Sequence, residues 1–262
     1  MGTWRLLKLE TCDACANMAI DEAMLTARIA NLAPNTLRFY RWRPSAVSIG
    51  KFQDAQKELQ LENCRDRGVD FVRRITGGGT VYHDAHGEIT YSVVVDKKDL
   101  GSQDITQVYS RIYAGLVEAL KILGITADFG EGNQNACPNL TVKGKKISGS
   151  AQAHKSGIVL QHGTLLLSVD LPKMFSLLRV PWARTCMEVV SVAEKRITSV
   201  NHELQRETSI EEMNGALVQG FKEALGIRFE EGRLSHYEQE LSAKLRKEKY
   251  ATAEWNLEGK NT

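Results

Sequence analysis

The sequence predicts a single α/β (α+β) domain built on a mixed, largely antiparallel sheet that is flanked by helices. Short strand-like runs occur next to one another, separated by turn residues, and do not alternate strictly with helices. Other segments repeat apolar residues at helical spacing. The 262 residues show no internal repeat and no low-complexity linker, so they predict one domain that spans residues 1–262.

The first part of the chain contains both periodicities. Alternating or continuous apolar runs predict strands at residues 3–10, twice within 36–52, at 69–76 and at 87–96. Helical spacing predicts helices at residues 15–31 and 55–68, the second ending at Gly68. Pro44 separates the two strands within residues 36–52 because it cannot continue a central strand.

The second part predicts a hairpin between helices. Residues 105–124 form a long amphipathic pattern that Gly124 closes. Residues 145–171 contain two β-rich stretches, which Ser156 and Gly157 are suited to join as a hairpin. Further helices are expected near residues 172–178, 209–226 and 235–250.

Composition and charge exclude several classes of protein. A hydrophobic content of 42% is ordinary for a soluble globular protein. A net charge of +2 gives no bulk attraction to nucleic acid. No apolar run is long enough to cross a membrane or to serve as a signal peptide, which predicts a cytoplasmic protein. Five cysteines at irregular spacing argue against a disulfide framework, and Cys12 and Cys15 lack the second ligand pair of a zinc site.

The run RRITGGGTVYHD, from Arg73 to Asp84, predicts a binding site. Its three glycines allow backbone to approach a ligand closely, but it fits neither GxxxxGK[ST] nor GxGxxG. It therefore reads as a strand-loop-strand whose amides face an anion, with bidentate contacts from Arg73 and Arg74. A tight glycine turn with surface arginines explains these residues alone equally well.

The run KGKKISGSAQ, residues 143–152, is the second candidate element. If it is a strand, alternation places Lys146, Ser148 and Ser150 on one face. Lys145, Ile147 and Gly149 then lie on the other face. One lysine is thus expected to face a ligand, although a lysine run is more often a solvated strand edge.

Two histidines and one cysteine are further candidates. His83 lies next to Asp84 and the glycines and is expected to form a polar wall of the pocket. His162 begins an apolar run, where a packed and hydrogen-bonded histidine is more common than a catalyst. Cys137 falls on an expected loop before the lysines, whose positive charge favours a reactive thiolate.

The chain resembles the lipoate-protein ligase A family, within the superfamily of biotin and lipoate ligases and octanoyl transferases. The resemblance covers nearly the whole chain and is carried by six strings in the same order: NMAIDEA, RPSAVSIGKFQ, RRITGGGTVYHD, KKISGSAQ, LQHGTLLL and KRITSV. It implies a biotin/lipoate protein ligase catalytic domain that uses ATP and Mg²⁺ to convert lipoate to lipoyl-AMP. The lipoyl group then passes to a lysine of an acceptor, either a lipoyl domain of a 2-oxoacid dehydrogenase complex or the glycine cleavage H protein.

The resemblance also implies residue roles. Lys146 is expected to be the catalytic cation, in contact with the phosphate and the activated carbonyl oxygen. The residues expected to bind ATP are Arg74, Gly79, Thr80, Val81, Tyr82 and Lys146. Those expected to bind lipoate are Met18, Trp42, Arg74, His83, Lys146 and His162. No metal-ligating protein residue is expected.

The accessory domain of many such ligases has no counterpart in this sequence, so a small separate accessory subunit is expected to assist the ligase.

Three alternatives to an ATP-dependent lipoate ligase remain open. The main rival is an ATP-independent octanoyl or lipoyl transferase that uses Cys137 as a thioester nucleophile. The ligase is favoured because the flanks of this cysteine, NACPNLTV, match the transferases only loosely. A non-catalytic lipoate or biotin carrier is disfavoured by Lys146, and biotin as substrate by the lack of a GRGR-like motif.

Overall fold

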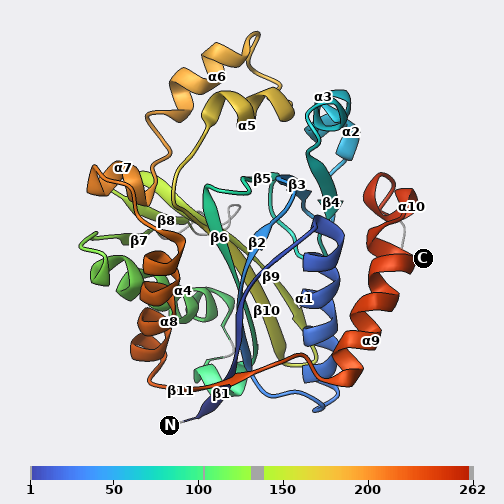
Figure 1. Cartoon of the computed structure of the whole chain (residues 1–262), viewed down its shortest axis with the longest axis vertical. Helices are drawn as coiled ribbons and strands as arrows, with labels where there is room; N and C mark the ends of the chain where they lie inside the picture. Colours follow the sequence, from blue (N-terminus) through green and yellow to red (C-terminus); the bar gives the residue numbers. More distant parts are fainter. Residues whose placement is uncertain (1, 103, 131–138, 260–262) are drawn as a thin grey trace.

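Two sheets organise the computed structural model, which describes residues 2–102, 104–130 and 139–259 (Figure 1). The large sheet has eight strands in the order β11-β1-β2-β6-β10-β9-β8-β7, and the small one has three in the order β4-β3-β5. Neighbouring strands run antiparallel except where β1 meets β11 and β2 and where β3 meets β4. The predicted mixed, largely antiparallel sheet flanked by helices is confirmed.

The elements have the following bounds. The strands are β1 (Thr3–Cys12), β2 (Thr36–Trp42), β3 (Ala46–Ile49), β4 (Asp70–Arg73), β5 (Val81–His83), β6 (Glu88–Asp96), β7 (Asp128–Gly130), β8 (Asn139–Val142), β9 (Lys145–Lys155), β10 (Ile158–Leu166) and β11 (Arg228–Gly232). The α-helices are α1 (Ala14–Ile29), α2 (Ala55–Glu58), α3 (Leu61–Asp66), α4 (Ile105–Ile122), α5 (Leu171–Leu177), α6 (Cys186–Ala193), α7 (Val200–Leu204), α8 (Ile210–Leu225), α9 (His236–Leu245) and α10 (Ala253–Asn256). A 3-10 helix, η1 (Lys97–Leu100), follows β6, and a π-helix, η2 (Arg246–Tyr250), extends α9.

Helices cover both faces of the large sheet, and the strand β6 shows why its sequence is apolar throughout. Val93 and Val95 pack in the main core with residues of α4 and α8, such as Leu116. Val94, between them, points to the opposite face and packs with Met24 of α1. Because both faces are buried, β6 reads as a continuous apolar run without polar alternation.

The predicted hairpin and most predicted long helices are confirmed. β9 and β10 pair antiparallel, beginning with Lys155 opposite Ile158 at the turn and ending with Ser148 opposite Leu165. Ser156 and Gly157 both have positive φ, at 50° and 81°, which suits a two-residue hairpin turn.

The described residues contain no helix with both the length and the apolarity needed to cross a bilayer.

The helix expected at residues 55–68 is instead two short helices. Leu59 has extended backbone (φ −117°, ψ 144°) and forms an isolated bridge with Leu178, while the Gln60 amide donates to the carbonyl of Leu177. Pairing with the segment after α5 therefore interrupts the helix. The strand expected directly after the glycines is present as β5, whereas the short elements β7, β8, β11, α6, α7 and α10 were not predicted, because a few residues carry too little periodicity.

Candidate active site

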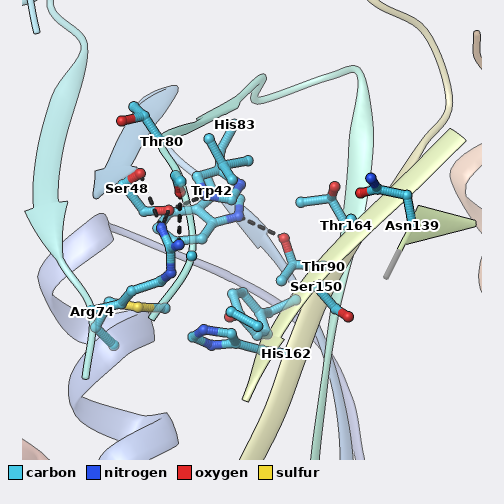
Figure 2. A pocket seen from close by; sticks show the side chains of 18 of the residues that line it. Trp42, Ser48, Arg74, Thr80, His83, Thr90, Asn139, Ser150, His162 and Thr164 are labelled. Carbon is cyan, nitrogen blue, oxygen red and sulfur yellow. Dashed lines mark hydrogen bonds between the residues drawn. The ribbon is translucent and has the colours of Figure 1, made fainter. Parts of the chain in front are cut away.

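One cavity of about 470 Å³ lies between α1, strands of both sheets and the loop of residues 76–80 (Figure 2). This loop, which contains Gly77, Gly78 and Gly79, is called the glycine loop. The cavity is lined by Met18, Tyr40, Trp42, Ser48, Arg74, Gly78, Gly79, Thr80, Val81, His83, Thr90, Asn139, Lys146, Gly149, Ser150, Ala151, His162, Gly163 and Thr164. The residues that the family resemblance assigned to ATP or lipoate thus line it, with the exception of Tyr82. Its volume falls in the range typical of small-molecule sites.

Tyr82 lies on the other face of β5. Val81 and His83 line the cavity, so alternation along the strand directs the Tyr82 side chain away from it. The Tyr82 ring is buried in the cluster that contains Leu177, and its hydroxyl donates to Asp84 Oδ2 at 2.7 Å. Tyr82, which was expected to bind ATP, is therefore absent from the cavity lining and directs its side chain away from it.

Arg74 holds the glycine loop with every N–H of its guanidinium. Nε donates to Thr76 Oγ1, and Nη1 donates to both the carbonyl and Oγ of Ser48. Nη2 donates to the carbonyls of Gly77 and Gly79, each at 2.7 Å. Since a guanidinium has five N–H donors, these bonds account for all of them. Arg74 lines the cavity, but in this arrangement it organises protein backbone.

A buried carboxylate-histidine relay reaches Arg74 from α1. Asp21 Oδ2 lies 2.9 Å from His162 Nδ1, and His162 Nε2 lies 2.7 Å from Thr76 Oγ1. Burial lowers the pKa of His162, which favours the neutral ring. Burial alone would raise the pKa of Asp21, but the hydrogen bond from His162 and the charge of Arg38 outweigh it and lower that pKa. His162 therefore donates from Nδ1 to an ionised Asp21 and accepts from Thr76.

A second relay of the same kind reaches Arg74 through Ser48. His83 Nδ1 lies 2.7 Å from Glu88 Oε1, and His83 Nε2 lies 2.9 Å from Ser48 Oγ. The indole of Trp42 stacks on the His83 ring with centroids 3.9 Å apart, and its N–H donates to Thr90 (Figure 2). The two histidines expected at the site are thus both present and both held by buried carboxylates.

Lys146 and Gly149 lie on the same side of β9, which corrects the predicted alternation. The pairing of β8 with β9 is irregular: Leu140 pairs with Ser148, but Thr141 pairs with Lys146, so Ile147 is an extra residue. A Cβ on Gly149 would lie 2.6 Å from Lys146 Nζ. The lysine side chain therefore extends over the glycine, and the prediction that they occupy opposite faces is wrong.

The string KRITSV explains how this irregular strand is held. The Lys146 amide donates to the carbonyl of Arg196 at 2.7 Å, and the Thr198 amide donates to the carbonyl of Lys146 at 2.9 Å. Lys146 and Ile197 form an isolated parallel bridge. A segment some fifty residues away in sequence therefore fixes the backbone of the cavity lysine.

Arg73 does not face the cavity, which corrects its expected role as an anion ligand. Its guanidinium donates to the carbonyls of Gly50, Lys51, Gln53, Trp255, Asn256 and Leu257. Burial lowers the pKa of Arg73, yet arginine remains charged in proteins. Arg73 thus joins the turn after β3 to α10.

Several residues of the site were not predicted from sequence. They are Tyr40, Ser48, Thr90, Asn139, Ser150 and Thr164 on the cavity wall, with Asp21, Thr76 and Glu88 behind it. The spacing of Met18 and Asp21 was the one local signal, because residues three apart share a helix face. Cys137 lies outside the described residues.

Replacing Asp21 by asparagine is expected to lower kcat/KM by about 10- to 100-fold, the range known for carboxylates that orient metal-ligating histidines. Asparagine cannot supply the charge that both Arg38 and His162 use. The measurement is steady-state kinetics at a temperature well below the melting temperature.

Glu238→Gln is the matched control for this variant. It disrupts another buried arginine-carboxylate pair, Arg5–Glu238, which is not part of the relays. Both variants should lose stability, whereas the Asp21 variant alone should lose activity per folded molecule. Equal losses of activity in the two variants would reduce Asp21 to a purely structural residue.

Known proteins resemble this chain along nearly its whole length. The family model of the lipoyl protein ligase A/B catalytic domain matches residues 13–222. The octanoyltransferase LipM of Kyrpidia tusciae is 40% identical over 274 residues, covering 98% of this chain and 99% of the relative. The octanoyltransferase LipM of Brevibacillus brevis is 36% identical over 277 residues, with the same two coverages.

Solved structures of similar fold are described as ligases. A structure of a bi-partite lipoate protein ligase and its lipoyl domain from Thermoplasma acidophilum matches with a TM-score of 0.87 and 33% identity, covering 100% of this chain and 99% of that chain. A lipoate-protein ligase A bound with ATP matches with a TM-score of 0.84 and 34% identity, covering 98% and 99%. The fold is therefore shared by ATP-using ligases and does not itself identify the reaction.

The prediction of an ATP-dependent lipoate-protein ligase is wrong. The curated relatives that align over nearly the full length are octanoyltransferases, which favours the rival prediction of acyl transfer. They also give no support to ATP or Mg²⁺ as cosubstrates. What holds is the coarser prediction of an enzyme of lipoate-related protein modification. The chain belongs to the lipoyl protein ligase A/B catalytic domain family.

Proposed function

We propose that this protein is an octanoyltransferase that moves an octanoyl group, without ATP, from a donor carrier protein to a lysine of a lipoyl domain. The observation that carries this proposal is the full-length similarity to octanoyltransferases. The acceptor follows from the similar ligase solved together with its lipoyl domain. A cytoplasmic location stays a prediction.

The cavity suits an eight-carbon acyl chain. Met18, Tyr40 and Trp42 supply apolar surface, and small residues such as Gly163 also line the cavity. Lys146 places an ammonium on the same wall as polar groups of β9. An apolar slot with the Lys146 ammonium at its side fits a hydrocarbon chain that ends in a reacting carbonyl.

Cys137 is the proposed nucleophile. It lies outside the described residues, but it is two residues from Asn139, which lines the cavity.

The proposed reaction has two balanced steps. The Cys137 thiolate attacks the carbonyl of the donor thioester, a new C–S bond forms, the old C–S bond breaks, and the donor leaves as a thiol after taking up a proton. The acceptor amine then attacks the enzyme thioester, a C–N bond forms, the C–S bond to Cys137 breaks, and the released thiolate takes the proton that the amine loses. The Lys146 ammonium stabilises the oxyanion in both steps.

Arg74 supports this reading over nucleotide binding. Its donors are all bonded to protein acceptors, so it contributes structure to the site without requiring a phosphate. The accessory subunit was expected only for the ligase and has no part in this proposal.

The test is a transfer assay with purified chain, octanoyl carrier protein and an unmodified lipoyl domain. The acceptor is expected to gain one octanoyl group by mass in the absence of ATP, at a rate that added ATP and Mg²⁺ do not change. Free octanoate should not serve as donor, with or without ATP. Transfer that needs ATP and free acid would overturn the proposal.

A further inference from the structure

The turn of residues 50–53 is joined by hydrogen bonds to Arg73 at the end of β4 and to Thr76, the residue before the three glycines. The Arg73 guanidinium holds the carbonyls of Gly50, Lys51 and Gln53. The Lys51 amide donates to the carbonyl of Thr76 at 2.9 Å, and the Gly50 amide donates to Gln53 Oε1 at 2.8 Å. This turn is therefore rigid relative to the loop that lines the cavity.

The turn also lies directly at the cavity wall. A Cβ on Gly50 would lie 2.1 Å from the Gly78 carbonyl oxygen, so the two backbones are in contact and Gly50 admits no side chain. Thr80 Oγ1 donates to Gln53 Oε1 at 3.3 Å. Gly78 and Thr80 both line the cavity, so residues 50–53 form part of its surroundings.

This rigid turn presents Phe52, which is 87% exposed. The ammonium of Lys51 lies 5.6 Å from the centre of the Phe52 ring. An exposed aromatic ring on a fixed backbone loses little conformational freedom on binding, which is the usual property of an interface anchor.

We propose that Phe52 is a docking contact for the acceptor lipoyl domain, a role that rests on the proposed function and specifies its partner surface. The acceptor lysine is joined to its domain only by a four-carbon side chain, so the body of the domain must lie against the cavity surroundings when the amine reacts. The ring and the neighbouring ammonium fit an apolar spot that is bordered by a carboxylate.

The test compares Phe52→Ala with Leu32→Ala, a matched control at an exposed apolar residue in the connection between α1 and β2. Isothermal titration with an unmodified lipoyl domain, in the absence of donor, is expected to show about tenfold weaker binding for the Phe52 variant and no change for the Leu32 variant. In transfer assays, KM for the acceptor should rise by a similar factor, with kcat and KM for the donor unchanged. Equal melting temperatures show that each fold is intact.

Binding of the Phe52 variant within about twofold of the unaltered protein would overturn the inference. So would a rise in KM for the donor alone, or no binding of the lipoyl domain by the unaltered protein. Because titration needs no turnover, it judges Phe52 even if the unaltered protein transfers no octanoyl group, a result that would overturn the proposed function instead.

Discussion

Replacing Lys146 by alanine is expected to lower the rate of octanoyl transfer by about 10³-fold while leaving the fold intact. The ammonium is the cation of β9 on the cavity wall, and loss of one donor to an oxyanion costs about 10²- to 10³-fold. The lysine backbone would keep its bonds to residues 196 and 198, so the strand should not change. Rapid-quench measurement of acyl transfer, with far-UV circular dichroism, checks both parts.

Lys145→Ala is the matched control, one residue earlier on the same strand. Its ammonium donates to the carbonyl of Glu194 at the surface, and Lys145 does not line the cavity. The control should transfer at nearly the unaltered rate. If the Lys145 variant loses activity while the Lys146 variant keeps it, the catalytic role belongs to Lys145 and not to Lys146.

Gly149→Ala gives an intermediate case. The added methyl would occupy the place of the Lys146 ammonium, and the flexible end of the lysine is what must move. Activity is therefore expected to fall with little change in melting temperature. Full activity of this variant would show that the lysine does not act from its position over Gly149.

Local pattern was enough to predict the parts of the fold that depend on neighbouring residues. The apolar run of β6, the amphipathic α4 and the turn at Ser156 and Gly157 each carry their own signal within a few residues. The cavity wall was also largely predicted, because the glycines and Lys146 stand in strings long enough to recognise. Only the family resemblance predicted that the glycines and Lys146 lie together at one site.

The wrong predictions concern residues whose position depends on segments far away in sequence. Arg73 and Arg74 are adjacent, yet one holds α10 and the other holds the glycine loop, and only the position of residues 255–257 distinguishes them. The extra residue at Ile147 depends on pairing with β8 and on residues 196–198. Asp21 and Glu88 contact the cavity histidines His162 and His83, and the contact of Asp21 joins residues far apart in sequence. The choice of reaction failed for a similar reason, since ligases and transferases share the fold and its strings.

Replacing Cys137 by serine is expected to abolish transfer and to remove the octanoyl adduct that the unaltered enzyme should carry. A thiol with an ordinary pKa near 8.5 is a few per cent ionised at neutral pH, whereas a serine hydroxyl is not ionised there unless a base activates it. Mass spectrometry after incubation with donor alone should find one octanoyl group on the peptide that contains Cys137, released by hydroxylamine. An ATP-dependent ligase would keep its activity with serine.

Cys186→Ser is the control that separates this role from thiol chemistry in general. Burial raises the pKa of Cys12 and Cys64, and it raises the pKa of Cys15 to about 11, so these thiols are poor sources of thiolate. Cys186 is exposed and is the remaining accessible competitor for an acyl group. It does not line the cavity, so its serine variant should keep both the adduct and the transfer rate. Transfer that survives in the Cys137 variant and disappears in the Cys186 variant would move the nucleophile away from the cavity and contradict the proposed route.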